Sequence, residues 1–503
     1  MKKSIEGVGD WKVIEPDGKE NWINLPINNP YVPMGSKEAK KGANAHTIFS
    51  KYSLGIATHR DAWVYNSSDK ELAKNIKVHI KYCNEEGPTK PDKPNPKRGS
   101  WSSDLDGKLE RLSKQGKKMI FDAKKIRTSL YRPFFKQQLY FDDILVTARY
   151  KIDDFYSNND TVNPAIIVPY HVSKPFSTFI TCITPDLQII QNGQCFPLYT
   201  YNDGVKKNNI TDSIVKEYRE HYRNNNISKD DIFYYVYAIL HHPRYRNYFR
   251  NNLIRDLPGI PMAPEFERFQ RAGRELANIH LNFDTGKRYS LGKPAFHPKG
   301  FIKITFGGKN EADKSIIRVD GHELFNGVPI SSYTVNGRTP VEWIAERFEK
   351  NKKIPKDKSG NFNDPCTGTD IVAVIERAVY VGLESDRIIK TLPKEFEPKN
   401  WKPKADPASL DAYSENGQKT RARPAKETRK SRSKSYDVHD SMVKRAQDLL
   451  VGNHVRKKFD KYQVVDKEKK YIIDEDDLRC ACPVYKKFNE CSHVWAVELC
   501  RRK

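Results

Sequence analysis

Apolar positions recur along most of the chain in two kinds of run, and each kind predicts a different element. The runs Ala165–Val168 and Ser177–Ile183 are short and apolar, which predicts buried strands. The longer stretch Asp230–His241 is almost wholly apolar after its first two residues and predicts a buried helix, with Ser228 or Asp230 as its N-cap. Short polar breaks separate these runs. The expected fold class is therefore mixed α/β (α+β), with more than one domain.

Changes in composition divide the chain into parts. Pro88–Gly99 is a proline-rich loop that no helix or central strand accommodates, and it separates two subregions of the main fold. After Leu392 the sequence becomes rich in proline, serine and charge, which is typical of a linker, and apolar runs return near Tyr436. The expected parts are an N-terminal extension at 1–44, a main region at 45–392, a linker at 393–435 and a C-terminal module at 436–503.

The charge of the chain points to a polyanionic partner. The formal net charge is +24, and such an excess attracts nucleic acid through steering and counterion release. Within the linker, Lys419–Lys434 holds eight basic residues against Glu427, enough to contact a phosphate backbone without sequence preference. A merely solubilising tether is the alternative. The linker residues proposed to contact DNA are Arg421, Arg423, Arg429, Lys430 and Arg432.

The hydrophobic content excludes two classes of protein. At 37% hydrophobic and 11% aromatic residues, the chain is too apolar to be disordered and too polar to be a membrane protein. It holds no run of eighteen apolar residues, and its first residues lack the apolar stretch of a signal peptide. We expect a cytoplasmic protein of a prokaryote, associated with the nucleoid when it binds DNA, and no membrane partner.

Four potential metal ligands lie close together near the C-terminus. Cys480 and Cys482 form one Cys-x-Cys pair, Cys491 and His493 form a Cys-x-His pair, and eight residues lie between the two pairs. Three thiolates and one imidazole can complete the tetrahedron that structural Zn²⁺ prefers. Strand-like runs around a charged turn within Tyr462–Cys480 precede the ligands, and together these features predict a small ββα-like zinc-binding module.

The ligand pattern resembles the SWIM-type zinc finger, whose Cys-x-Cys, spacer and Cys-x-His order it matches without a gap. Buried thiols with an unrelated histidine are the alternative. Cys500 lies outside the pattern and is expected to be a spare thiol, like the scattered cysteines of the main region.

A series of stretches in the main region carries a resemblance to a known family, in order from about residue 45 to residue 392. They are Ser53–Asn66, Phe121–Asp142, Ser173–Gln188, Gly193–Tyr199, Asp230–Arg246, Leu257–Phe266, Ala272–Phe283 and Asn336–Phe348. With these stretches the region resembles the C-terminal specificity region of type ISP restriction-modification enzymes, which join nuclease, translocase, adenine methyltransferase and target-recognition modules in one chain. The resemblance implies a role in recognising a DNA target.

The catalytic motifs of such an enzyme are missing from this sequence. No phosphate-cradling G-x-x-x-x-G-K-[ST] loop occurs, and no glycine-rich methyl-donor turn is intact. The string Asn28–Tyr31 approaches the Asn-Pro-Pro-Tyr loop of adenine methyltransferases but lacks its second proline. Asp92 and Asp122–Lys124 only imitate the carboxylates and lysine of a nuclease. We therefore expect no catalysis by the chain alone.

Candidate DNA contacts within the matched stretches are cations and amides that lie beside aromatic residues. Phosphate contacts need Lys and Arg, while base readout needs a few rigidly held Arg, Lys, Asn or Gln side chains. The alternative is that the aromatic residues belong to the core and the charges form structural ion pairs. The candidates are Arg60, Asn66, Arg127, Arg132, Lys136 and Lys174.

Three functions fit these observations. The first is sequence-specific binding of double-stranded DNA, as the target-recognition component of a restriction-modification or related defence system with a structural zinc finger. The second is one part of a split adenine-specific DNA methyltransferase that is active only with a partner chain. The third is an adaptor whose zinc finger binds another protein. In the first two, a separate methyltransferase, helicase or nuclease chain supplies catalysis.

Overall fold

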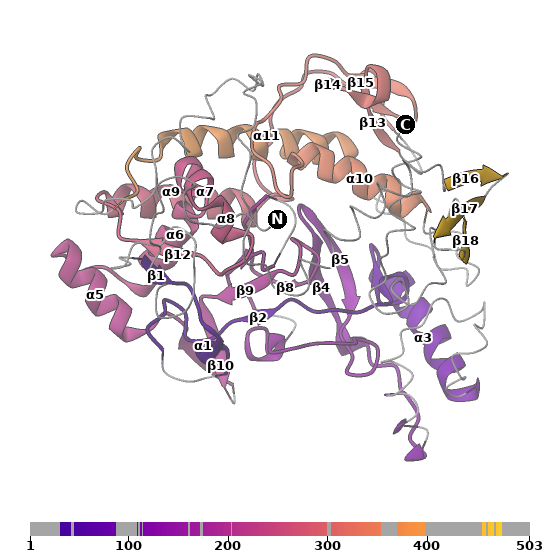
Figure 1. The fold of residues 1–503 in the computed structure, drawn as a ribbon, viewed down its shortest axis with the longest axis horizontal. Helices are drawn as coiled ribbons and strands as arrows, with labels where there is room; N and C mark the ends of the chain where they lie inside the picture. The colour runs from indigo at the N-terminus through magenta and orange to yellow at the C-terminus, as the bar shows by residue number, and fades with distance from the viewer. Residues whose placement is uncertain are drawn as a thin grey trace, which may run out of the picture. The chain divides into compact units, whose positions relative to one another are not determined.

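The computed structural model describes most of the main region and part of the C-terminal region. The described residues are 31–41, 45–86, 108, 111–112, 114–158, 161–171, 175–202, 204–298, 303–353, 370–397, 455–458, 461–466 and 469–474. The chain divides into two compact units, residues 1–412 and 413–503. Several sheets and many helices occur in the first unit, which confirms the mixed α/β class (Figure 1).

Two four-stranded sheets form the centre of the first unit. One has the order β2-β9-β6-β7 and the other the order β3-β5-β4-β8. All pairings are antiparallel except that of β4 with β8. Their strands are β2 (Ser53–Leu54), β3 (Tyr65–Asn66), β4 (Ile126–Arg132), β5 (Phe135–Tyr140), β6 (Ala165–Val168), β7 (Phe179–Thr181), β8 (Thr184–Pro185) and β9 (Gln194–Pro197).

Strand β6 confirms the buried strand expected at Ala165–Val168, and it explains why that run is apolar without alternation. Ala165 and Ile167 lie in one hydrophobic core, and Ile166 and Val168 lie in a second. Successive side chains of a strand point to opposite faces, so a strand between two cores must be apolar at every position. Strand β7 occupies part of the second predicted run.

Three smaller sheets complete the strands of the first unit and all are antiparallel. Strand β1 pairs with β12, β10 pairs with β11, and β13, β14 and β15 form a three-stranded sheet in that order. Their bounds are β1 (Tyr31–Pro33), β10 (Tyr199–Asn202), β11 (Val205–Asn208), β12 (Gly259–Pro261), β13 (Ile304–Gly307), β14 (Asp313–Val319) and β15 (His322–Phe325).

Helices cover the sheets, and α6, α9, α11 and α10 pack in succession against one another. Helix α9 packs on α6, and α11 packs on both α9 and α10 (Figure 1). The helices are α1 (Lys37–Lys41), α2 (Asp61–Val64), α3 (Asp69–Glu86), α5 (Asp212–Tyr222), α6 (Lys229–Ile239), α7 (Pro243–Tyr248), α8 (Arg250–Leu253), α9 (Phe266–Leu281), α10 (Pro340–Lys353) and α11 (Ile371–Thr391). Short 3₁₀ turns lie at Ala123–Lys125, Ile152–Asp154 and Lys309–Glu311.

Helix α6 confirms the buried helix expected at Asp230–His241, with Ser228 as its N-cap. The Ser228 hydroxyl accepts a hydrogen bond from the Asp231 backbone N–H at 3.1 Å, and the Asp231 carboxylate accepts one from the Ser228 N–H at 2.9 Å. This reciprocal capping box satisfies two of the backbone donors that a helix N-terminus leaves unpaired. It fixes the start of the helix at the serine that the sequence indicated.

A buried series of side-chain hydrogen bonds connects the helices α6, α9 and α11. The His280 ring on α9 hydrogen-bonds the Tyr237 hydroxyl of α6 at 2.7 Å and the Ser385 hydroxyl of α11 at 2.9 Å. Both His280 and Ser385 are fully buried. Burial lowers the pKa of His280 to about 3, so the ring stays neutral and can bridge a donor and an acceptor. These hydrogen bonds serve as a structural cross-link between the helices, because solvent does not reach them.

The second unit is described only at three strands. Strands β16 (Val455–Lys458), β17 (Lys461–Asp466) and β18 (Lys469–Asp474) form one antiparallel sheet in that order. Strands β17 and β18 confirm the two strand-like runs expected around a charged turn. The boundaries proposed for the linker and the C-terminal module, and the other expected domain boundaries, stay predictions.

Two further sequence expectations concern the proline-rich loop and membrane-spanning helices. The proline-rich loop at Pro88–Gly99 lies outside the described residues. Within the described part of the chain, no helix is both long and apolar enough to cross a membrane.

Candidate nucleic-acid interface

Arg132 lies at the centre of a cluster of polar side chains at the C-terminal end of β4. Its guanidinium donates to Asp186 at 2.8 Å and to Asp61 at 3.3 Å. The Tyr131 hydroxyl donates to Asp61 at 2.8 Å, and the Tyr65 hydroxyl donates to Asp186 at 3.1 Å. The cluster therefore connects α2, β3, β4 and the segment after β8 through charge-assisted hydrogen bonds.

The two carboxylates of this cluster differ in burial, since the Asp61 side chain is 36% exposed and Asp186 is buried. Asp186 is 4% exposed, and burial raises its pKa to about 7, with Asp61 adding to the rise and Arg132 opposing it. The guanidinium of Arg132 also lies 3.9 Å above the Tyr131 ring, where a cation is attracted to the aromatic face. Arg132 thus has its donors directed at protein groups in this structure.

Arg60 and Arg127 also hydrogen-bond backbone carbonyls inside the fold. Arg60 is 4% exposed and donates to the Leu145 carbonyl at 2.6 Å. Arg127 donates to the Tyr156 carbonyl at 3.2 Å and lies 4.1 Å from the centre of a phenylalanine ring. Burial lowers the pKa of Arg127 to about 10. Both side chains hold loops against the sheet, and their contact with DNA stays a prediction.

Asn66 is buried at the end of β3, where it organises the entry to α3. Its side-chain oxygen accepts a hydrogen bond from the Ser68 N–H at 3.0 Å, directly before the helix begins at Asp69. The residue is 1% exposed. A base-reading role for Asn66 would require it to leave this position, and that role also stays a prediction.

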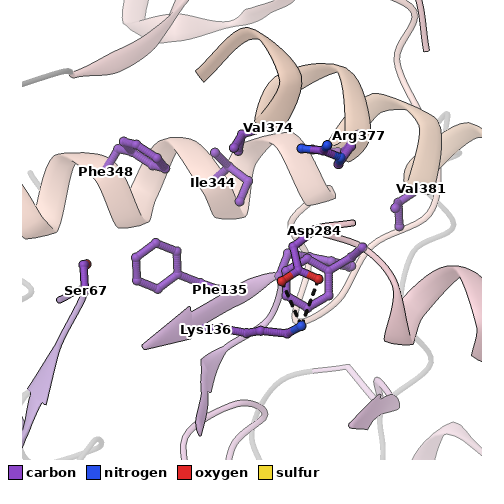
Figure 2. A pocket seen from close by; sticks show the side chains of 12 residues that line it. Ser67, Phe135, Lys136, Asp284, Ile344, Phe348, Val374, Arg377 and Val381 are labelled. Atoms are coloured by element: carbon purple, nitrogen blue, oxygen red, sulfur yellow. Dashed lines mark hydrogen bonds and ion pairs between the residues drawn. The ribbon is translucent and has the colours of Figure 1, made fainter. Parts of the chain in front are cut away.

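Lys136 lies on β5 at the mouth of a pocket of about 240 Å³. Its ammonium pairs with the Asp284 carboxylate at 2.8 Å, and Figure 2 shows the two facing each other at one end of the pocket. The walls are mainly aromatic and aliphatic, and Arg377 from α11 is among the lining side chains (Figure 2). Lys136 is half-buried, with 27% of its side chain exposed.

The remaining candidates fall on residues whose placement is not described. Lys174 is one of them, as are the five linker residues Arg421, Arg423, Arg429, Lys430 and Arg432. The proposed zinc ligands Cys480, Cys482, Cys491 and His493 also lie outside the described residues. Across the described stretches, no three His, Cys, Asp or Glu side chains come together as a metal site would require.

The sequence analysis missed the exposed face of α3, which carries lysines at regular spacing. Lys70, Lys74, Lys77 and Lys81 are exposed, at intervals of four, three and four residues. Residues so spaced share one face of a helix. The signal was present in the sequence, because the apolar residues of Asp69–Glu86 repeat on the opposite face, but this stretch falls outside the segments that carried the family resemblance.

The fold is a mixed α/β domain, and its family is assigned from the sequence. Residues 47–372 match the family described as the Type ISP C-terminal specificity domain. The match covers more than half of the 503 residues. The chain therefore belongs to this family.

Three solved structures of related architecture are each longer than this chain. The DrdV–DNA complex, determined by cryo-electron microscopy, has a TM-score of 0.65 and 28% identity over 77% of this chain and 41% of that chain. LlaBIII, an ATP-dependent Type ISP restriction-modification enzyme bound to DNA, has a TM-score of 0.64 and 23% identity over 76% and 26%.

A nuclease-deletion mutant of the Type ISP enzyme LlaGI, in complex with a DNA substrate mimic, has a TM-score of 0.62 and 24% identity over 78% of this chain and 37% of that chain. The chain thus spans less than half the length of each of these proteins. No curated protein matches it.

Proposed function

We propose that this chain binds duplex DNA in a sequence-specific manner, as the target-recognition component of a restriction-modification system. The observation that carries the proposal is the family match over residues 47–372. It is supported by the likeness of the fold to the DrdV–DNA complex and by the net charge of +24. We assign catalysis to a separate methyltransferase, helicase or nuclease chain, because this sequence holds no intact methyl-donor turn and no intact nucleotide-binding loop.

Two kinds of contact are expected to share the binding energy. The rigid first unit would carry the base contacts, because base readout needs side chains held in fixed geometry. The linker would add phosphate contacts from its eight basic residues, which need no scaffold. Sequence preference and salt dependence should therefore be separable.

The test is titration of the full chain and of a linker variant with duplexes at several salt concentrations. Replacing the eight basic residues of Lys419–Lys434 by Gln should weaken binding to all duplexes alike, because each lost phosphate contact lowers the log–log salt slope by about 0.9. Sequence preference should survive in the variant, which keeps the linker length. Loss of preference in this variant would show that specificity does not lie in residues 45–392.

We also propose that Cys480, Cys482, Cys491 and His493 hold one structural Zn²⁺ in the C-terminal unit. The support is their paired spacing, which supplies four ligands of the types that zinc prefers. Strands β17 and β18 lie directly before the first pair. A module this small builds only a limited hydrophobic core, so the metal would contribute much of its folding free energy.

Elemental analysis of the purified chain should find about one zinc per chain. Cys482→Ser or His493→Ala should abolish the zinc and make the C-terminal unit sensitive to protease, while the first unit keeps its resistance. Cys500→Ser is the matched control and should retain the metal, because Cys500 lies outside the pattern. Full zinc content in both ligand variants would contradict the assignment.

A further inference from the structure

One pocket of the first unit has mainly apolar walls and a charged end. Its volume is about 240 Å³, and it lies between β5, the segment just after α9, and the helices α10 and α11 (Figure 2). We infer that this pocket, which we call the β5–α11 pocket, binds a purine base. A free nucleoside and a base that has left the stack of bound DNA both offer this chemistry. Only the second source rests on the proposed function.

The walls of the β5–α11 pocket are side chains that the fold holds in place. Phe135 of β5 is 7% exposed and Phe348 of α10 is 2% exposed, and their ring centres are 6.4 Å apart in an edge-to-face arrangement. Phe283, just after α9, is 9% exposed. Figure 2 shows Phe348, Ile344 and Val374 on the side of the helices, with Phe135 across from them. Such walls favour a flat aromatic ligand, because they offer it stacking and dispersion contacts.

The charged end of the pocket consists of Lys136 and Asp284. The Lys136 ammonium donates to one Asp284 oxygen at 2.9 Å and lies 2.8 Å from the other. The two side chains are 27% and 37% exposed, so solvent reaches this end. Within the described part of the chain, the Asp284 carboxylate accepts from no side chain other than Lys136. An ammonium has three donors and a carboxylate has about four lone-pair sites, so both groups can hydrogen-bond a ligand while they stay paired.

A purine edge complements this pair because it carries a donor next to an acceptor. Adenine presents its N6 amino group beside N7 or N1, and guanine presents N1–H beside O6. The Asp284 carboxylate would accept from the donor, and the Lys136 ammonium would donate to the acceptor. A ring without polar atoms would cover the charges and return no hydrogen bond, which costs free energy. Apolar contacts on the ring faces with hydrogen bonds on one edge are how proteins hold a base outside the duplex.

The volume of the pocket favours a purine over a smaller ring. An apolar protein cavity of roughly 150 Å³ holds benzene, which is a single six-membered ring. The β5–α11 pocket is about 1.6 times as large, which suits two fused rings. A pyrimidine would leave part of the space empty, and the wall atoms there would lack contacts. We therefore expect purines to bind more tightly than pyrimidines.

The first experiment titrates adenosine, guanosine and cytidine into the full chain by calorimetry. The unmodified chain should bind about one purine nucleoside per chain, at least about tenfold more tightly than cytidine. Val374→Phe adds a ring to the wall of the pocket and should weaken purine binding at least about tenfold. The matched control is Val372→Phe, because Val372 is also partly buried on α11 but does not line the pocket. It should change Kd less than about twofold.

A second variant tests the charged end without filling the pocket. Lys136→Met removes the ammonium donor and should weaken adenosine about tenfold, because a charge-assisted hydrogen bond is lost. Indole has two fused rings but no acceptor for the ammonium, so its Kd should stay within about twofold. Because 27% of the Lys136 side chain is exposed, this variant should fold even if Val374→Phe does not. Thermal melting of each variant shows which of them are folded.

The second experiment asks whether the base comes from bound DNA. The fluorescent base 2-aminopurine replaces each purine of a preferred duplex in turn, and its emission rises when it leaves the stack. The unmodified chain should raise the emission severalfold at one position. Val374→Phe should abolish this rise while it still binds the duplex, and Val372→Phe should keep it.

The outcomes separate the inference from the proposed function. Nucleoside binding that Val374→Phe and Lys136→Met both weaken assigns the pocket to free purines, and an emission rise that Val374→Phe abolishes assigns it to a base of bound DNA. If neither is observed with a chain that binds duplexes, the inference is wrong and the proposed function stands. Binding or emission that Val374→Phe leaves unchanged would also overturn the inference, because the purine would then lie elsewhere. If the chain binds no duplex, the proposed function fails and the nucleoside titration alone decides the inference.

Discussion

Arg132→Met is expected to destabilise the first unit by about 3 kcal/mol, because it leaves the Asp186 carboxylate buried without its cation. Asp186 is 4% exposed and receives its strongest donor, at 2.8 Å, from the Arg132 guanidinium. Methionine fills much of the volume of the arginine stem, so the loss reports on the charge. The same change would remove the hydrogen bond from Arg132 to Asp61.

The pH dependence of the variant gives a second readout. The pKa of Asp186 already stands at about 7, and removing Arg132 should raise it further, because that guanidinium lowers it. A carboxyl whose folded pKa exceeds its unfolded value loses its contribution to stability as the pH rises through the folded pKa. The variant should therefore continue to lose stability as the pH rises above about 7, where the contribution of Asp186 in the unmodified chain levels off.

Chemical denaturation monitored by tryptophan fluorescence measures both effects. Lys136→Met is the matched control, since it breaks an ion pair on the adjacent strand that is 27% and 37% exposed, and it should cost under about 1 kcal/mol. Arg132→Met/Asp186→Leu should recover much of the lost stability, because it removes the orphaned charge. An unchanged midpoint for Arg132→Met would mean that the cluster is dispensable and would favour a direct role of Arg132 on DNA.

The elements that could be predicted from the sequence are those whose burial or capping is visible in the local pattern of apolar and polar residues. The β6 run was recognisable because both of its faces lie in a core, and α6 because its N-cap and its apolar content coincide. The hairpin of β17 and β18 was visible as two apolar runs around a charged turn. In each case the information lies within about a dozen residues, which is the range over which hydrophobic periodicity operates.

The candidate DNA contacts were harder to judge, because their partners are distant in the sequence. Arg132 binds Asp61 and Asp186, which lie 71 and 54 residues away, and Arg60 binds the Leu145 carbonyl 85 residues away. A cation beside aromatic residues has the same local sequence whether it contacts phosphate or supports a sheet.

Gly273 occupies the closest approach between α6 and α9, and it illustrates a constraint that no local pattern reveals. A Cβ built on Gly273 would overlap the Tyr234 carbonyl oxygen and come within 2.7 Å of its carbonyl carbon. Both atoms belong to the backbone of α6, so a side-chain rotation cannot relieve the overlap. The two helices could accommodate an alanine methyl group at position 273 only by moving apart. That movement would also lengthen the hydrogen bond between the Tyr237 hydroxyl and the His280 ring.

Gly273→Ala is therefore expected to lower the free energy of unfolding by about 3 kcal/mol, even though alanine favours a helix by about 1 kcal/mol over glycine. Equilibrium denaturation of the full chain measures the change. Arg271→Ala, on the exposed side of the same helix, is the control and should stay within about 0.5 kcal/mol of the unmodified chain. A gain in stability for Gly273→Ala would mean that helix propensity outweighs the contact, and that α6 and α9 lie farther apart than the structure places them.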